Sequence, residues 1–191
     1  MGRQEDPLTG VVLYGPPAAG KDTITRALIA VDQRYELFRR LKAGPGRSSG
    51  YRMIDGTTLQ TLRASGRVLW ENTRYGATYV VDQPALNFVA AQAIPVLHLG
   101  QVEAINRVTA ATSEIRWFVV ELWCSRAVAA ERISERQTGD LPERLAAYDQ
   151  TERLPDALTD LRIATDTMTP QEASDQIRDL VMLDAAPSPD A

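Results

Sequence analysis

The sequence predicts an α/β fold, with a mostly parallel β-sheet and helices on both of its faces. Three observations favour this fold. Short apolar runs alternate with segments of helical periodicity, as in strands joined by crossover helices. The longest apolar run, residues 117–123, is almost wholly apolar, which is typical of a parallel strand buried on both faces. The first apolar run, residues 11–14, is followed by a glycine-bounded loop and then directly by a helix.

The predicted strands end at glycine, proline or charged residues and cover residues 11–14, 36–39, 68–70, 95–99, 117–123 and 161–164. The predicted helices have apolar residues at helical spacing and cover residues 21–30, 57–64, 84–93, 101–108, 126–137, 141–151 and 170–182. Asp82 and Ser125 are the expected N-caps of two of these helices. Residues 43–50, AGPGRSSG, are expected to form a loop, and residues 185–191 to be disordered.

The composition indicates one ordinary globular domain of 191 residues, with 44% hydrophobic and 24% charged residues. No apolar run reaches the ~18 residues that span a bilayer, and the first ten residues contain no signal-peptide pattern. The single cysteine, Cys124, excludes an internal disulfide and a cysteine-based zinc site. The net charge of −4 disfavours binding to nucleic acid. We therefore expect a cytoplasmic protein with no nucleic-acid or membrane partner, and leave its oligomeric state open.

The segment VVLYGPPAAGKDT has the order of strand, glycine-bounded loop and helix that phosphate binding requires. Small residues allow backbone N–H groups to converge on phosphate oxygens, and the helix N-terminus adds partial positive charge. Lys21 supplies a mobile positive charge for the β- and γ-phosphates, and a hydroxyl in the first helical turn can reach Mg²⁺. The strict pattern has Ser or Thr directly after the lysine, but here Asp22 stands there and Thr23 follows. The alternative is a glycine turn with a purely structural role.

ATP is the expected ligand of this loop, and Mg²⁺ is the expected cofactor. The residues expected to bind ATP are Gly15, Pro16, Pro17, Ala18, Ala19, Gly20, Lys21, Asp22 and Thr23.

A basic segment stands out in this acidic protein. Between residues 34 and 52 there are six basic residues against one acid, Glu36. They are Arg34, Arg39, Arg40, Lys42, Arg47 and Arg52. Such a segment suits a small anionic ligand better than a polyanion. The alternative is a solvated loop with loose charges.

These motifs resemble those of the guanylate kinase group of nucleoside monophosphate kinases, over roughly residues 10–182. The loop GPPAAGKDT looks like that group's phosphate loop, and its GKD variant looks especially like the loop of ribose 1,5-bisphosphate phosphokinases. In several monophosphate kinases the metal-facing hydroxyl lies two places after the lysine, so the resemblance makes Thr23 the expected Mg²⁺ ligand. It also implies a P-loop NTPase fold with a small acceptor-binding insert, about residues 35–82, and a short lid, about residues 136–144.

The resemblance also implies an acceptor site. Residues 39–44, followed by Gly50-Tyr51, look like the arginine-rich segment that grips the acceptor's phosphate, so Arg39, Lys42 and Tyr51 would form a phosphate clamp. Residues 66–79 look like the family's base-recognition stretch, which makes Glu71 a candidate contact to the base or ribose. The expected acceptor-binding residues are Arg39, Lys42, Arg47, Tyr51, Glu71, Tyr75, Tyr79 and His98.

Residues 132–145 resemble the lid of these kinases, whose arginines close over the transferring phosphate. Arg132 and Arg136 lie four apart and share one face of the predicted helix, and Thr138-Gly139-Asp140 supplies a flexible joint. Arginines suit a transition state whose charge is spread over equatorial oxygens. Lys21, Arg136 and Arg144 are therefore the expected catalytic residues. The alternative is an ordinary solvated helix rich in arginine and glutamate.

One departure from the family pattern concerns the strand end His98-Leu99-Gly100. Guanylate kinases carry two aspartates after this strand, which serve the metal and the guanine, so the resemblance does not establish guanine specificity. His98 is either a hydrogen-bonded core residue or part of the acceptor pocket. Glu121 lies in an apolar strand and is expected to be paired or to lie near a cavity.

The sequence thus predicts an ATP-dependent phosphotransferase that transfers the γ-phosphate of Mg·ATP to a phosphorylated acceptor, with a purine nucleoside monophosphate first. One alternative is a kinase of a phosphorylated sugar, such as ribose 1,5-bisphosphate, or of a specialised metabolite. Another is a non-catalytic guanylate-kinase-like binding module. Such modules generally lose the phosphate loop, whereas Gly20, Lys21 and Thr23 are present here.

Overall fold

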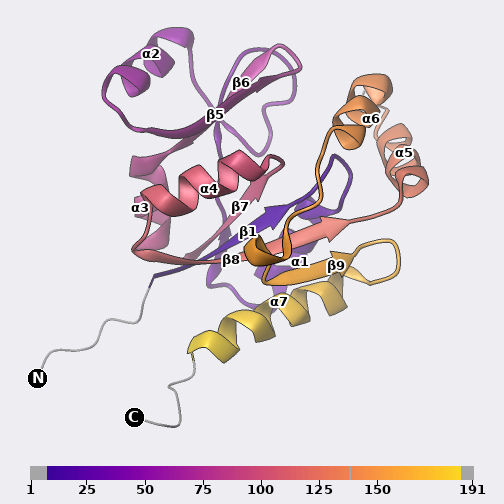
Figure 1. Cartoon of the computed structure of the whole chain (residues 1–191). Coiled ribbons are helices and arrows are strands. Elements are labelled where there is room, and N and C mark those ends of the chain that lie inside the picture. The colour runs from indigo at the N-terminus through magenta and orange to yellow at the C-terminus, as the bar shows by residue number, and fades with distance from the viewer. Residues whose placement is uncertain (1–7, 138, 186–191) are drawn as a thin grey trace, which may run out of the picture.

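The computed structural model describes residues 8–137 and 139–185 (Figure 1). Within this part of the chain, five strands form a central sheet, four strands form a second, smaller sheet, and seven α-helices pack around them. The tail predicted to be disordered begins at the last residue of the final helix, and residues 186–191 lie outside the described residues. No helix in the described ranges is both long enough and apolar enough to cross a membrane.

The central sheet has the strand order β2, β7, β1, β8, β9. Its strands are β1 Leu8–Tyr14, β2 Tyr35–Leu37, β7 Ile94–Leu99, β8 Ile115–Trp123 and β9 Leu161–Ala164. All four pairings are parallel, and Leu13 of β1 lies opposite His98 of β7 and Val120 of β8. The prediction of an α/β fold with a mostly parallel sheet is confirmed. The carboxyl ends of these strands meet at one edge, where ligands bind in folds of this kind.

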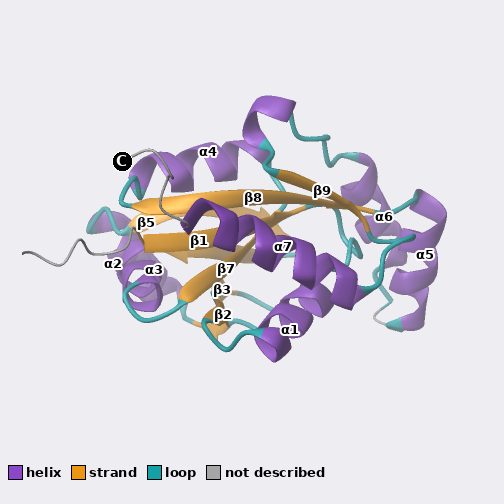
Figure 2. Cartoon of the chain, turned by 90° about the horizontal axis from the view of Figure 1, so that it is seen from below, coloured by secondary structure: helices purple, strands orange, loops and turns teal. Residues whose placement is uncertain are grey.

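Helices cover both faces of the central sheet, because successive residues of a strand point to opposite faces. Val12 and Tyr14 pack with α3 and α4, whereas Val11 and Leu13 pack with α1 and α7. Figure 2 shows α1 and α7 lying across their face of the sheet. The bounds of these helices are α1 Lys21–Val31, α3 Gln83–Ala90, α4 Val102–Ala111 and α7 Pro170–Ala185. All four were predicted, with ends that differ by one to three residues.

The second sheet has the order β4, β3, β6, β5 and stands above one edge of the central sheet, with α2 on its outer side (Figure 1). Its elements are β3 Leu41–Ala43, β4 Arg52–Met53, α2 Gly56–Ala64, β5 Val68–Arg74 and β6 Ala77–Asp82. Its strands β3, β4 and β6 were not predicted, because they are short or polar and have no clear apolar alternation. Since β2 belongs to the central sheet, the second sheet occupies residues 41–82 of the expected insert 35–82.

Two helices form the lid region, α5 Arg126–Glu135 and α6 Leu141–Asp149 (Figure 1). Ser125 caps α5 as predicted, since its hydroxyl accepts a hydrogen bond from the backbone N–H of Val128. The helix ends two residues earlier than predicted, because Arg136 is its C-cap and Gln137 has a φ of +50°. Thr138 of the expected flexible joint lies outside the described residues.

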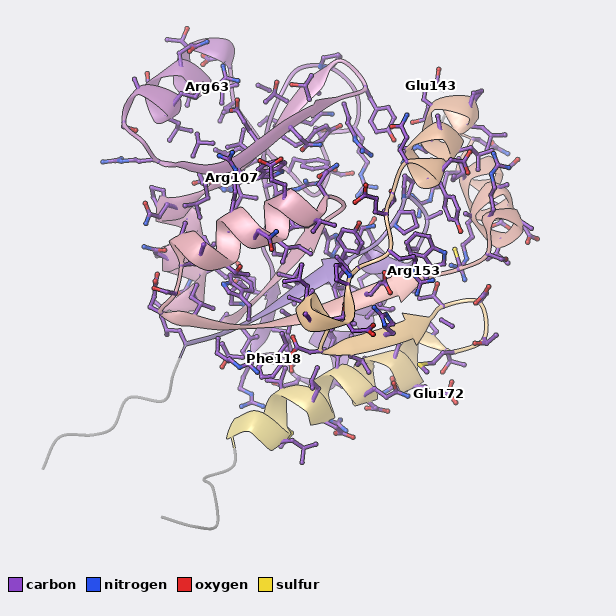
Figure 3. All side chains as sticks on the ribbon, in the orientation of Figure 1. Arg63, Arg107, Phe118, Glu143, Arg153 and Glu172 are labelled. Carbon is purple, nitrogen blue, oxygen red and sulfur yellow. The ribbon has the colours of Figure 1, made fainter. Side chains whose placement is uncertain are left out.

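Glu121 of β8 is fully buried, and three donors surround its carboxylate. Arg153 donates at 2.8 and 3.0 Å, Arg162 at 2.9 Å, and the backbone N–H of Leu154 at 2.7 Å. Burial alone would raise the pKa of this carboxyl, but the hydrogen bonds outweigh burial and hold the pKa below its usual value. The expectation that Glu121 is paired is confirmed. It fixes the segment that returns from α6 to β9, where Figure 3 labels Arg153.

Glu121→Gln is expected to lower the free energy of unfolding by about 2 kcal/mol at neutral pH, because Arg153 and Arg162 lose a charged acceptor. The folded pKa of Glu121 lies below its unfolded value of about 4.3, so its contribution is full above that value and is lost as the pH falls through the folded pKa. The difference between the two proteins should therefore shrink in acid. Urea unfolding of both proteins, at neutral pH and in acid, measures this difference in the free energy of unfolding.

The matched control is Glu103→Gln on the exposed surface of α4, where Glu103 pairs with Arg107. This change should cost less than about 0.5 kcal/mol at either pH. Equal losses for the two variants would contradict the assigned role of Glu121.

Candidate active site

A cavity of about 300 Å³ lies where the carboxyl ends of β1 and β7 meet. Its walls come from the loop after β1, from the second sheet and from the lid region (Figure 1). Seven basic side chains line the cavity, against two acidic ones, Asp22 and Asp140. The basic residues are Lys21, Arg40, Lys42, Arg47, Arg74, Arg136 and Arg144. This concentration of positive charge makes the cavity a site for an anionic ligand.

The loop after β1 has the backbone conformation of a phosphate-binding loop. Gly15 has a φ of +152°, and a Cβ there would lie 2.2 Å from the carbonyl oxygen of Leu122, so only glycine fits. Gly20 has a φ of +91° and is the N-cap of α1, which places the positive end of the helix dipole at the loop. Lys21 Nζ donates to the carbonyl oxygens of Gly15 at 2.6 Å and Pro16 at 2.8 Å. Lys21 therefore lies folded across the loop.

Lys21 is crowded by burial and by other cations. Burial first, and then the positive charges of Arg40 and Arg136, lower its pKa to about 7, while Asp22 opposes them. An anionic group at this point would favour the protonated lysine. The repulsion between these positive charges is unfavourable, and a bound phosphate group reduces it.

Not all residues of the expected phosphate clamp line the cavity. Phe38, Arg40 and Lys42 line it. Arg39 is exposed and does not line it, which corrects its expected role in the clamp. Arg40 takes its place, with its guanidinium 5.4 Å from the ring centre of Tyr79.

Lys42, Arg47 and Tyr51 lie in the cavity wall as expected. Lys42 is 2% exposed, and its Nζ donates to the carbonyl oxygen of Arg47 at 2.8 Å. It also lies 5.6 Å from the ring centres of both Tyr51 and Tyr79, within reach of a cation–π interaction. Lys42 therefore holds the loop that carries Arg47 against the two tyrosines.

The expected base contact is also on the wrong side of its strand. Glu71 pairs with Arg63 of α2, with the closest contact at 2.8 Å, and it does not line the cavity. Figure 3 labels Arg63 on α2, at the outer end of the second sheet. The neighbours of Glu71 in the alternation of β5, Asn72 and Arg74, line the cavity instead. Asn72 Oδ1 is buried and has no hydrogen-bond partner among the described residues.

Tyr75, Tyr79 and His98 lie in the cavity wall, as expected for acceptor-binding residues. Tyr75 has a φ of +54°, and the guanidinium of Arg144 lies 5.6 Å from its ring centre. The structure therefore gathers all the expected acceptor residues except Arg39 and Glu71. It adds Arg40, Arg74 and Asp140, which the sequence analysis did not assign to the site.

The lid arginines separate into two groups. Arg136 and Arg144 line the cavity, and Arg144 Nε donates to Asp140 at 2.7 Å. Arg132 instead donates to the carbonyl oxygens of Ala18 at 3.1 Å and Thr165 at 2.7 Å. It ties the phosphate-binding loop to the segment after β9. Arg136 is the C-cap of α5, and it lines a second hollow together with Arg132.

The structure places Asp22 in the cavity and Thr23 outside it. Asp22 lines the cavity, 3.6 Å from His98 Nδ1. Thr23 lines a second hollow of about 520 Å³ on the other side of the loop, together with Arg26, Arg132 and Thr165. The hydroxyl of Thr23 lies 3.5 Å from the guanidinium of Arg26. The expected magnesium ligand therefore points away from the cavity in which the basic residues gather.

No protein-family model matches the chain, and no curated protein is similar to it in sequence. Its structure is similar to solved kinase structures. The guanylate kinase from Anaplasma phagocytophilum matches with a TM-score of 0.66 and 14% identity, over 94% of this chain and 87% of that one. A gluconokinase from Sinorhizobium meliloti 1021 matches with 0.53 and 15%, over 94% and 95%. A shikimate kinase from Acinetobacter baumannii matches with 0.51 and 17%, over 94% and 96%. At these identities the similarity shows the fold, which is that of the P-loop kinases.

Arg132 and Arg136 are expected to differ in how much they contribute to the free energy of unfolding. Arg132→Gln is expected to lower the free energy of unfolding by about 1–3 kcal/mol, because its charged hydrogen bonds to Ala18 and Thr165 are lost. Arg136→Gln should change it by less than about 0.5 kcal/mol, since that side chain is exposed. Urea unfolding of both variants measures the difference, and equal effects would contradict the assignment.

Proposed function

We propose that this protein is an ATP-dependent phosphotransferase that transfers the γ-phosphoryl group of Mg·ATP to a phosphorylated small molecule, with a purine nucleoside monophosphate as the first candidate. One observation carries the proposal: a single cavity is lined by the phosphate-binding loop on one side and by a cationic, aromatic acceptor wall on the other. Donor and acceptor phosphates would meet there in a site built to neutralise both.

The donor side has a place for each part of ATP. The phosphates would lie against the loop from Gly15 to Thr23, with Lys21 turning from the loop carbonyl oxygens to the phosphates. The second hollow begins on the other side of this loop and is larger, so it can take the base and ribose. Arg132 and Thr165 form part of its wall, and their hydrogen bond fixes that wall to the loop.

Magnesium is the expected cofactor of this transfer, and the residues present fit it. The Asp22 carboxylate offers oxygen atoms, the ligand type that Mg²⁺ prefers, in the cavity wall beside Lys21. Bound with ATP, Mg²⁺ would supply positive charge that neutralises the charge developing on the phosphates.

The acceptor's phosphate would lie among Arg40, Lys42, Arg47 and Tyr51. Arginine binds phosphate through two parallel N–H groups, and Tyr51 can donate through its hydroxyl. Lys42 is held by the Arg47 carbonyl and the two tyrosines, so its main role is to position this wall.

Selection of the base would depend on Asn72. Its buried Oδ1 has no partner among the described residues and can accept a hydrogen bond from an N–H group of a base. A carboxylate accepts only, which suits guanine, but an amide also donates and can pair with adenine as well. Because Glu71 is paired with Arg63 outside the cavity, its carboxylate is not available there to select guanine.

A phosphorylated sugar is the second candidate, and a specific observation favours it. Arg74 and Arg144 line the cavity near Tyr75, in addition to the basic residues of the phosphate clamp. A second anionic group on the acceptor would find partners there, as in a sugar that carries two phosphates. A non-catalytic binding module is the least favoured function, because the loop and Lys21 retain the geometry for binding a nucleotide.

During transfer the protein would contribute position and charge. Lys21 and Arg136 face the cavity from opposite walls, so both can contact the transferring group. Arg144 can join them once its ion pair with Asp140 rearranges. Three cations around the equatorial oxygens stabilise the transition state, and closure of the lid excludes water.

Lys21→Ala is expected to lower kcat by at least about 100-fold and to leave the fold intact, because its charge acts on the phosphates. The assay follows ADP release from ATP with a panel of purine and pyrimidine monophosphates, sugar phosphates and unphosphorylated nucleosides. Thermal unfolding of the same preparation serves as the control for folding. Turnover with no phosphorylated acceptor, or normal turnover by a folded Lys21→Ala protein, would contradict the proposed function.

Arg40→Met and Arg39→Met form a matched pair of neighbouring substitutions. Arg40→Met should raise the KM for the acceptor by about 10- to 100-fold, because a charged hydrogen bond to phosphate is worth ~1.5–3 kcal/mol. Arg39→Met should change it less than about twofold, since its side chain lies outside the cavity. The reverse result would restore Arg39 to the phosphate clamp.

A further inference from the structure

Asp22 places its carboxylate in a strongly basic cavity, where no donor among the described residues lies within hydrogen-bond distance of it. It follows Lys21 directly and lines the cavity in which phosphates are proposed to bind. Its nearest charged neighbours are His98 Nδ1 at 3.6 Å and Arg47 Nη1 at 3.8 Å, and it accepts no hydrogen bond shorter than 3.5 Å from the described residues. A bare carboxylate beside a triphosphate would repel it. The position therefore calls for a positive partner that arrives with the nucleotide.

His98 lies beside Asp22 and is held by Thr25. Thr25 is almost fully buried, and its hydroxyl donates its only hydrogen to the carbonyl oxygen of Lys21 at 2.9 Å. Towards His98 Nε2, 2.7 Å away, the Thr25 oxygen must therefore accept, so Nε2 carries an imidazole hydrogen. This contact directs Nδ1 towards the Asp22 carboxylate, 3.6 Å away.

A carboxylate beside the phosphates of a nucleotide is stabilised when a cation lies between the two. Magnesium fits this position: it binds through one or two carboxylates plus substrate phosphates, and it keeps several waters. The hydroxyl of Thr23, in contrast, faces the second hollow and Arg26.

We propose that the Asp22 carboxylate is the protein ligand of the divalent cation that accompanies the nucleotide, in place of the hydroxyl that the strict loop pattern provides. This inference rests on the proposed ATP-dependent function. It also explains why no carboxylate is needed at the end of β7, since Asp22 brings one to the same point from α1.

The test measures how strongly Mg²⁺ tightens the binding of ADP. Isothermal titration calorimetry gives the Kd of ADP with excess Mg²⁺ and with EDTA, for the wild-type protein and for Asp22→Asn, which removes the charge and keeps the shape. In the wild-type protein Mg²⁺ should tighten binding by about tenfold or more, and in Asp22→Asn by less than about twofold. The electron paramagnetic resonance signal of Mn²⁺ gives a second measure, since the variant with ADP should hold less protein-bound Mn²⁺.

Asp140→Asn is the matched control. It removes the other negative charge from the same cavity, where Asp140 lies beside Arg144, so it reports any general effect of charge on ADP affinity. It should retain the tightening by Mg²⁺, and so should Thr23→Val, which removes the hydroxyl expected from the family pattern.

The outcomes separate the two proposals. If Asp22→Asn remains folded and retains the full tightening by Mg²⁺, the inference is overturned and the proposed function stands. If Thr23→Val loses the tightening and Asp22→Asn does not, the hydroxyl is the ligand. If the wild-type protein binds neither ADP nor ATP under any of these conditions, the proposed function fails and the inference falls with it.

Discussion

Seven basic side chains gather in one cavity of a protein whose net charge is −4, and their mutual electrostatic repulsion is unfavourable. Like charges at short range repel, so such a cluster needs surroundings that reduce the repulsion. The rings of Tyr51 and Tyr79 lie within 6.0 Å of both Arg40 and Lys42, and aromatic faces attract cations. The cost that remains appears at Lys21, whose pKa is lowered to about 7 by burial first and then by neighbouring cations. A phosphorylated ligand removes this cost, so the charge arrangement favours the bound state.

Ion pairs outside the cavity complement this arrangement, because they keep acids away from it and fix the walls. Glu71 holds Arg63, which joins β5 to α2. Glu121 is fully buried and holds the segment that leads from the lid back to the sheet. Asp82 pairs with Arg52 and also caps α3, so it links the second sheet to the central one. Acids thus serve structure, and Asp22 and Asp140 are the two that reach the cavity wall.

The central sheet and its helices could be predicted because their apolar runs are long, and burial on both faces leaves a clear pattern. The second sheet could not, since strands of two or three residues such as β4 and β3 carry charged side chains and acquire their register only from neighbours. The glycines of the loop after β1 were predictable, because Gly15 and Gly20 adopt backbone conformations that favour glycine. The helices α5 and α6 were predicted in place, but the end of α5 at Glu135 was not.

The errors at the site share one physical cause. Arg39 against Arg40, Glu71 against Asn72 and Thr23 against Asp22 are each a shift by one position. A resemblance between motifs carries a role to a sequence position, whereas the direction of a side chain depends on the register of its strand or the phase of its helix. One residue in a strand turns a side chain from the cavity to the opposite face, as Glu71 shows by its pair with Arg63. The chemistry that lines the cavity follows the face, so under the proposed function an amide would stand where a carboxylate was expected in the acceptor wall, and a carboxylate where a hydroxyl was expected in the loop. Such exchanges can alter base selection and metal binding while the fold of the site stays the same.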